Sequence, residues 1–213
     1  RVDPNLSKEG HLTITSGYDA NLQKTSEEAV QKGLLAYMNR HKLTEADPLP
    51  QIASISIDVH TGEIRAIVGG TNIENSLYNR AFYALRQPGS SIKPFLYALA
   101  FDQGFTQSTF VLDAPITFSH AKFGTWSPEN YEDEYHGFIP IRRALETSKN
   151  TAAVRTLQEI GVGNFITWLK QLGFTTQIEP DLTIALGSSS VYLVELAKAY
   201  ATFANGGHLV QPS

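Results

Sequence analysis

The chain has 213 residues, of which 42% are hydrophobic, and this is enough for a globular core. Its 17 basic and 21 acidic residues give a net charge of −4 without a basic cluster, which argues against nucleic acid as a partner. The absence of cysteine excludes disulfides, thiolate catalysis and zinc–thiolate sites. The six histidines show no metal-ligand spacing, and no apolar run is long enough to span a membrane. We therefore predict neither a metal nor another cofactor.

The first predicted elements are a short extended segment and a long helix. Residues His11 to Thr15 alternate between apolar and polar side chains, which is typical of an edge strand or a linker. Asp19 is a good N-cap, and the sequence from there to about His41 has the periodicity of an amphipathic helix. Its apolar face is expected to enter the core and consists of Leu22, Ala29, Val30, Gly33, Leu34, Tyr37 and Met38.

Two runs of alternating residues predict an antiparallel hairpin. Residues 53–59 alternate between apolar and polar side chains, and residues 64–68 do so again after the turn His60-Thr61-Gly62. Gly69-Gly70 then ends the hairpin, because paired glycines interrupt regular structure.

The stretch from Gln87 to Phe95, followed by an apolar run, predicts a buried helix with a hydroxyl and an amine at its start. Pro94 is tolerated only in a first helical turn. Ser90 and Lys93 are then one turn apart on one face. Burial lowers the pKa of a lysine, so a neutral Lys93 can accept the proton of Ser90. A serine cap beside an ordinary lysine is the alternative interpretation.

Between Gly104 and Gly137 the sequence predicts a long irregular region. Its acidic cluster consists of Glu129, Glu132, Asp133 and Glu134. This cluster lacks the alternating ligands around a glycine that a calcium loop requires. We therefore expect a solvated loop.

Further helices are predicted from Pro140 to Thr147, from about Thr151, and from Val191 to about Ala204. Ser148-Lys149-Asn150 connects the first two, and on a tight connection its hydroxyl and amide can point the same way. A simple helix cap is one alternative. A helix-turn-helix reader of nucleic acid is another, but no basic recognition face follows.

Several stretches in one order resemble class A high-molecular-mass penicillin-binding proteins. Serine-x-x-lysine at 90–93 and serine-x-asparagine at 148–150 are two of the three signatures of penicillin-recognising serine acyl-transferases. The flanking matches are Thr61 to Gly70, Asn79-Arg80-Ala81, Arg86 to Ser91, Trp126 to Tyr131, Leu186-Gly187-Ser188 and Ala204 to Gly207. Ala144-Leu145 matches as well, and Leu22-Gln23 with Glu27-Glu28-Ala29 resembles the linker that precedes the transpeptidase domain in this family. The resemblance therefore covers nearly the whole chain.

The resemblance implies an α+β penicillin-binding/β-lactamase-like transpeptidase fold, in which helices flank an antiparallel sheet. This chain is expected to represent only part of that fold. Residues 1–50 would be a linker that follows a glycosyltransferase domain, and residues 51–213 the N-terminal part of the transpeptidase domain. The resemblance also implies the periplasmic, extracytoplasmic face of the bacterial inner membrane, with an anchor upstream of Arg1.

The implied reaction is the cross-linking of peptidoglycan stem pentapeptides through an acyl-enzyme, and β-lactam antibiotics would acylate the same serine. The implied catalytic residues are Ser90, Lys93, Ser148 and Asn150, and the implied substrate-binding residues are Trp126 and Asn130. Ser90 would attack the penultimate D-Ala carbonyl with Lys93 as its base, and Ser148 would pass protons toward the leaving group. Asn150 would hold the bound peptide.

The third family signature, a Lys-Thr/Ser-Gly strand, does not follow Asn150 in this sequence. Lys24-Thr25-Ser26 precedes Ser90 and lies in a predicted helix, so it is rejected as a substitute. We therefore expect the chain to be a fragment. It would be inactive alone unless the remainder of the transpeptidase domain is supplied, in the same chain or in another.

Two other functions stay open. A serine β-lactamase or D,D-carboxypeptidase shares the first two motifs, but no glutamate follows Asn150 in the pattern that activates a deacylating water. A non-catalytic β-lactam sensor or scaffold would keep Ser90 only for binding or shape. The intact Lys93 and Ser148 argue against that second alternative.

Overall fold

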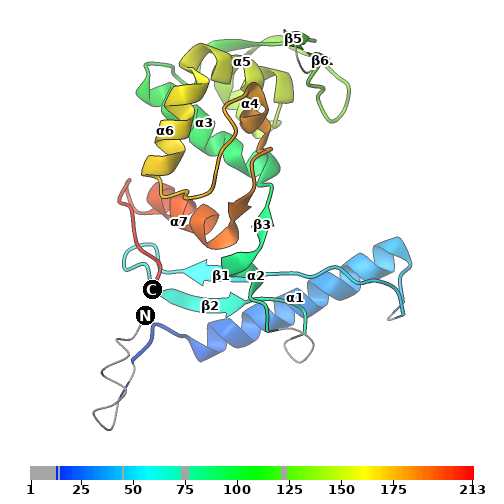
Figure 1. Ribbon diagram of the computed structural model, residues 1–213, viewed down its shortest axis with the longest axis vertical. Helices are drawn as coiled ribbons and strands as arrows, with labels where there is room; N and C mark the ends of the chain where they lie inside the picture. The colour runs from blue at the N-terminus through cyan, green and yellow to red at the C-terminus, as the bar shows by residue number, and fades with distance from the viewer. Residues whose placement is uncertain (1–12, 14, 45, 73–76, 121–123) are drawn as a thin grey trace. The chain divides into compact units, whose positions relative to one another are not determined.

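The computed structural model describes residues 13, 15–44, 46–72, 77–120 and 124–213. The chain forms two compact units, one of Arg1–Ala81 with Tyr200–Ser213 and the other of Phe82–Ala199. Figure 1 follows the elements of both in chain order. The predicted strand or linker at residues 11–15 lies mostly outside the described residues. Among those that are described, no helix has both the length and the apolar character needed to cross a membrane.

Helix α1 (Ala20–His41) begins where the sequence predicts, because Asp19 caps it. The Asp19 carboxylate accepts hydrogen bonds from the first free N–H groups of the helix, at 2.9 and 3.0 Å. The predicted core face of α1 is larger than the part of the helix that is buried, so this prediction is wrong in its extent. Of the helix residues, all of which are described, only Val30 is buried, and Leu22 is 37% exposed. In its own unit the helix packs against a two-stranded hairpin, which is too narrow to cover the whole apolar face.

Strands β1 (Ser54–Ile57) and β2 (Ile64–Val68) form the predicted antiparallel hairpin. Helix α1 lies along the outer edge of β2 (Figure 1). There the amide of Gln23 donates to the carbonyl of Ile67 at 2.9 Å and accepts from its N–H at 2.8 Å. A side-chain amide thus occupies the position of a neighbouring strand, which protects an edge that would otherwise be open to pairing.

The second unit holds most of the helices. They are α3 (Lys93–Asp102), α4 (Ile141–Glu146), α5 (Asn150–Ile160), α6 (Val162–Gln171) and the start of α7 (Leu193–Ala204). The 3₁₀ turn η2 (Gly89–Ile92) directly precedes α3, and the 3₁₀ turn η3 (Leu182–Leu186) lies between α6 and α7. The short α2 (Arg80–Tyr83) spans the boundary of the units in the sequence. Helices α3 and α5 pack against each other, and their buried side chains form the centre of one hydrophobic core. Helices α3, α4, α5 and α7 were predicted from the sequence, and their bounds differ from those expected by a few residues.

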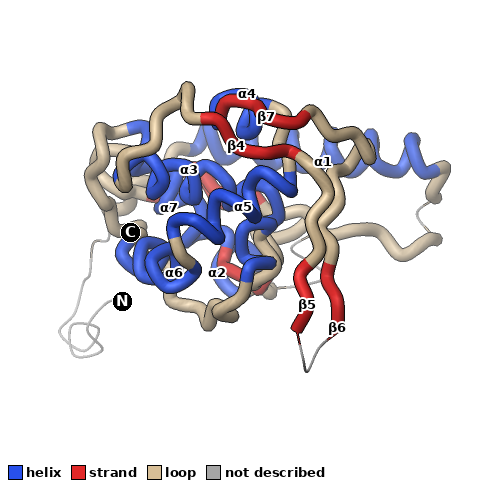
Figure 2. The backbone as a smooth tube through the Cα atoms, turned by 90° about the horizontal axis from the view of Figure 1, so that it is seen from above, coloured by secondary structure: helices blue, strands red, loops and turns tan. Residues whose placement is uncertain are grey.

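The remaining strands form short antiparallel pairs in the second unit. They are β3 (Leu85–Arg86) with β8 (Val191–Tyr192), β4 (Phe110–Asp113) with β7 (Gly137–Pro140), and β5 (Phe118–His120) with β6 (Gly124–Trp126). Figure 2 shows the β5–β6 ribbon extending away from the helices of this unit. The predicted irregular region is therefore wrong, since strands of three or four residues are too short to show a periodic pattern. Helices and antiparallel pairs together confirm the predicted α+β class.

A close approach of two backbones positions the segment that precedes α3. Gly187, which ends η3, has φ +72°, and its carbonyl accepts a hydrogen bond from the N–H of Gly89 at 3.3 Å. A Cβ atom at Gly187 would overlap the backbone of Gly89. Glycine is required there both by the left-handed backbone and by this contact. The residue that follows Gly89 is Ser90, so the contact bears directly on the predicted nucleophile.

We predict that Gly187→Ala destabilises the chain more than Gly104→Ala does. Gly104 also has a positive φ, +95°, but a Cβ atom there meets nothing within 4 Å. The control should cost about 1 kcal/mol through backbone strain, whereas Gly187→Ala adds the overlap and should cost about 2–4 kcal/mol. Chemical denaturation gives both free energies of unfolding. Equal losses in the two variants would contradict the role of the close approach.

Candidate functional site

Ser90 lies on the 3₁₀ turn η2 immediately before α3, and its side chain is exposed. The local sequence explains this placement. Gly89 adopts φ +56°, which reverses the chain, and Pro94 occupies the first turn of α3, where its missing N–H costs nothing. The predicted position of Ser90 at the start of a buried helix is thus confirmed. An exposed hydroxyl at the start of a helix is accessible to a substrate.

Lys93, the first residue of α3, is buried, with 1% of its surface exposed. Its Nζ donates to the Ser148 carbonyl at 2.7 Å, to Ser148 Oγ at 3.1 Å and to Asn150 Oδ1 at 2.6 Å. Burial lowers the pKa of Lys93 to about 8. A substantial fraction of the side chain is therefore a neutral amine slightly above neutral pH, as a general base requires.

The connection between α4 and α5 brings together Ser148 and Asn150, the two residues that accept hydrogen bonds from Lys93. Ser148 has φ +53°, an uncommon conformation for a residue with a side chain. This conformation turns both the carbonyl and the hydroxyl of Ser148 toward Lys93, while Asn150 begins α5 on the same side. The sequence-based prediction that hydroxyl and amide point the same way is confirmed.

Asn130 is 4% exposed and its side-chain amide is used by the protein itself. It donates to Asp113 Oδ1 at 2.7 Å, and its Oδ1 accepts from the N–H of Asn150 at 2.8 Å. Trp126, on β6, stacks against Phe118 with ring centroids 5.6 Å apart. The two predicted substrate-binding residues therefore differ in placement, since Asn130 lies at the site and Trp126 on the protruding ribbon.

Ser90, Ser148 and Asn150 line a cavity of about 370 Å³ in the second unit, and Lys93 lies behind it. Its lining residues are Ser90, Asn130, Tyr131, Glu132, Thr147, Ser148, Lys149 and Asn150. Trp126 is not among them. In the described part of the chain no hydrogen bond joins Ser90 Oγ to Lys93 Nζ, and such catalytic contacts often tighten only when a substrate binds.

Sequence reasoning missed several residues of this site. Tyr131 and Glu132 are exposed on the loop that borders the cavity, and Thr147 precedes Ser148. Asp113 was also missed, although it is fully buried behind Asn130. The only sequence signal for Asp113 was a lone carboxylate at the end of an apolar run, which has no specific meaning until its partners are known.

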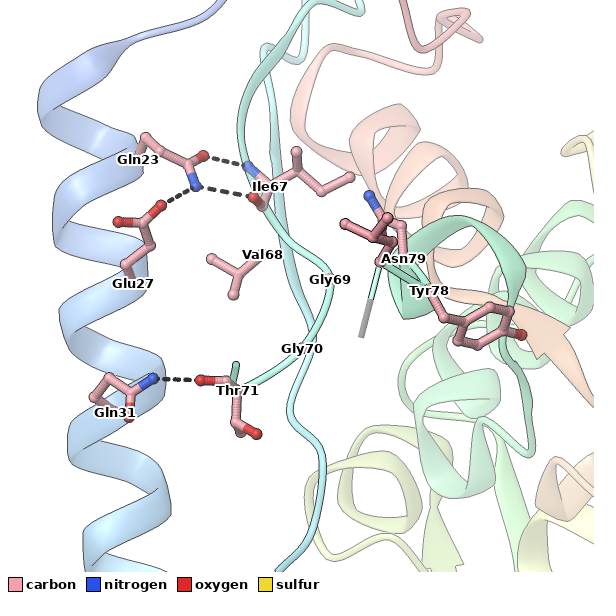
Figure 3. A pocket seen from close by; sticks show the side chains of 11 residues that line it. Gln23, Glu27, Gln31, Ile67, Val68, Gly69, Gly70, Thr71, Tyr78 and Asn79 are labelled. Atoms are coloured by element: carbon pink, nitrogen blue, oxygen red, sulfur yellow. Dashed lines mark hydrogen bonds between the residues drawn. The ribbon is translucent and has the colours of Figure 1, made fainter. Parts of the chain in front are cut away.

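A second cavity, of about 560 Å³, lies in the first unit between α1 and the loop after β2. Figure 3 shows its polar side chains bonded to the protein: Gln23 to Ile67 and Glu27, and Gln31 to the carbonyl of Thr71. Among the described residues that line it there is no serine and no lysine. The cavity at Ser90, where a serine lies near a buried lysine, is therefore the stronger candidate for chemistry.

The arrangement around Ser90 suits nucleophilic acyl transfer. It combines an exposed hydroxyl, a buried amine of lowered pKa, and a second hydroxyl and an amide that contact that amine. Among the residues that the structure describes, no group of three or more His, Asp or Glu side chains is placed to bind a metal ion.

Comparison with known proteins points to one family. Residues 52–213 match the family model described as penicillin binding protein transpeptidase domain. Penicillin-binding protein 1A from Neisseria cinerea is 37% identical over 196 residues, covering 89% of this chain and 25% of the relative. The same protein from Pseudomonas aeruginosa is 44% identical over 167 residues, covering 78% of this chain and 20% of the relative. The chain thus spans about a quarter or less of the length of these curated relatives.

Two solved structures extend the comparison. Penicillin-binding protein 1A from Haemophilus influenzae has a TM-score of 0.74 and 38% identity, over 78% of this chain and 25% of that one. PonA1 from Mycobacterium tuberculosis in complex with penicillin V has a TM-score of 0.79 and 26% identity, over 99% of this chain and 56% of that one. The similarity therefore holds in both sequence and fold.

We predict that Lys93 titrates near pH 8, with ammonium below that value and neutral amine above it. Burial disfavours the charged form, which lowers the pKa of Lys93 from its ordinary value of 10.5 to about 8. A ¹³C NMR titration of the lysine ε-methylene groups measures the midpoint. Lys93→Arg identifies the signal by removing it. A midpoint above about pH 10 would contradict the burial that the structure gives this side chain.

Proposed function

Because the chain belongs to the penicillin-binding protein transpeptidase family, we propose that it is the nucleophile-bearing part of a serine D,D-transpeptidase of peptidoglycan synthesis. The predicted resemblance to class A penicillin-binding proteins is confirmed by the relatives found. The single observation that carries the proposed activity is the set of contacts at Lys93. A buried lysine with lowered pKa, next to an exposed serine, matches what acyl transfer by serine requires.

In the first half of the proposed reaction, Ser90 Oγ attacks the penultimate D-Ala carbonyl of a stem pentapeptide. Lys93 Nζ takes the hydroxyl proton as a neutral amine. The C–N bond to the terminal D-Ala then breaks, and Ser148 Oγ, 3.1 Å from Lys93 Nζ, passes a proton to the leaving amine. The product of this half is an ester between Ser90 and the stem peptide.

In the second half, the amine of a neighbouring stem peptide attacks the ester and releases Ser90. Asn150 has two roles in the proposal: its Oδ1 accepts from Lys93 Nζ at 2.6 Å, and its amide holds the bound peptide. The N–H of Ser90 supplies half of the oxyanion hole. The other half, in the family resemblance, belongs to the Lys-Thr/Ser-Gly strand, a signature that does not follow Asn150 in this sequence.

The wider context of the chain is also a proposal. Residues 1–50 would link to a glycosyltransferase domain and residues 51–213 would belong to the transpeptidase domain, completed by further strands. The site would lie at the outer face of the inner membrane, with β-lactam antibiotics as ligands and an anchor elsewhere in the protein. The penicillin V complex of PonA1 supports the proposed ligand class.

We predict that a fluorescent penicillin labels Ser90 in the protein encoded by the complete open reading frame that contains this chain. Ser90→Ala should abolish labelling, whereas Ser91→Ala is the matched control, because its Oγ is bonded to the Pro88 carbonyl. The labelling rate should rise about tenfold per pH unit below pH 8 and level off above it, because only the neutral form of Lys93 acts as base. Gel fluorescence against time and pH gives these rates.

The same measurement separates the alternatives. Labelling that disappears within seconds indicates hydrolysis, as in a β-lactamase, and a stable label that Ser90→Ala does not remove contradicts the proposal. Full complementation of a cell-wall defect by Ser90→Ala favours a scaffold. The 213 residues expressed alone are expected not to label, and robust labelling at Ser90 would show that they suffice.

A further inference from the structure

A carboxylate that the proposed reaction does not use is buried behind the site. Asp113, at the end of β4, has none of its surface exposed. Its Oδ1 accepts from Thr151 Oγ1 at 2.6 Å and from Asn130 Nδ2 at 2.7 Å, and its Oδ2 accepts from the N–H of His136 at 3.0 Å. Burial alone would raise the pKa of Asp113, but these hydrogen bonds outweigh it and leave the pKa below its ordinary value. Asp113 is thus a charged acceptor near neutral pH.

The carboxylate determines how the amide of Asn130 is oriented. A carboxylate can only accept hydrogen bonds, so the Nδ2 group of Asn130 must face it. Nδ2 makes a second bond, to the carbonyl of Glu134 at 2.9 Å. Both donor positions of the amide are then used, and Oδ1 points in the opposite direction, toward the start of α5.

Helix α5 depends on that oxygen for its cap. Its own N-cap residue, Lys149, makes no side-chain capping bond. Instead Asn130 Oδ1 accepts from the N–H of Asn150 at 2.8 Å and from the N–H of Thr151 at 3.4 Å. A residue 20 positions away in sequence therefore performs the capping that a serine or aspartate at the N-cap usually provides.

The first residue of this capped helix is the acceptor of the proposed base. Asn150 Oδ1 lies 2.6 Å from Lys93 Nζ, and its Nδ2 donates to the carbonyl of Glu129 at 2.8 Å. Hydrogen bonds therefore connect Asp113 to Asn130 and Asn130 to the backbone N–H of Asn150, whose side chain in turn contacts Lys93.

We propose that Asp113 is a positioning residue for acyl transfer, which orients the amide of Asn130 so that it caps α5 and holds Asn150 against Lys93. The inference rests on the proposed function. It also assigns Asn130 a supporting role through the protein rather than direct contact with substrate. A buried carboxylate that only stabilised the fold would leave the titration of Lys93 unchanged.

The test is Asp113→Asn in the complete open reading frame, with Asp102→Asn as the matched control at the exposed end of α3. The asparagine keeps the shape but can present a donor to Thr151 or Asn130. We expect the plateau rate of labelling by fluorescent penicillin to fall about 10- to 100-fold. We also expect the pH midpoint to move below about 8, because Asn150 Oδ1 no longer stabilises the ammonium form of Lys93. Asp102→Asn should change neither value.

A double-substitution cycle identifies the route. If Asp113 acts through Asn150, then Asp113→Asn should have little further effect on the rate when Asn150→Ala is already present. Additive losses would overturn the proposal, as would a lowered melting temperature with an unchanged rate and pH midpoint. A rise in the pH midpoint of labelling would also overturn the proposal.

A second variant covers the case in which Asp113→Asn does not fold. Thr151→Val keeps the side-chain volume and leaves Asp113 in place, but removes the 2.6 Å hydrogen bond between residue 151 and that carboxylate. A smaller fall in the labelling rate and a smaller fall in the pH midpoint are therefore expected. Their absence would count against the proposal. If the unsubstituted protein is not labelled at all, the proposed function fails, and the NMR titration of Lys93 in the same variants still tests the positioning.

Discussion

The site depends on one buried amine and the three oxygen atoms that surround it. Lys93 is buried at the start of α3, and burial alone favours its neutral amine over the charged ammonium form. The two oxygens of Ser148 and the amide of Asn150 satisfy its N–H groups when it is charged. The lysine therefore stays inside the fold in either protonation state, and its pKa lies near the pH at which a base is useful. The rest of the second unit holds the Lys93 amine and the three surrounding oxygen atoms in place.

Two backbone features place the partners of Lys93. The left-handed conformation of Ser148 directs a carbonyl and a hydroxyl to the same amine, which a regular helix end would not do. The close approach of Gly187 to Gly89 fixes the turn that carries Ser90. Both features lie at turns beside helices, where side chains can be exposed on a rigid core. The core between α3 and α5 supplies that rigidity.

Local elements were predicted well where their pattern is periodic. The Asp19 cap, the hairpin of β1 and β2, and the start of α3 follow from capping, alternation and proline placement. Strands β4 and β7 were missed because each is short and they pair across a long stretch of sequence, and β5 and β6 because three residues are too few to show alternation. The apolar face of α1 was overestimated, since periodicity shows which side chains share a face but not how much of that face a neighbour covers.

The sequence by itself identified the family, through the order of serine-x-x-lysine and serine-x-asparagine with their flanking stretches. It also predicted Ser90, Lys93, Ser148 and Asn150 as the residues of the site. Tertiary structure alone decided what surrounds them. Asp113 and Asn130 reach α5 from a separate strand and loop, and no local pattern predicts such contacts. The physical reason is that burial sets the pKa of Lys93, and hydrogen bonds between distant segments set the position of Asn150.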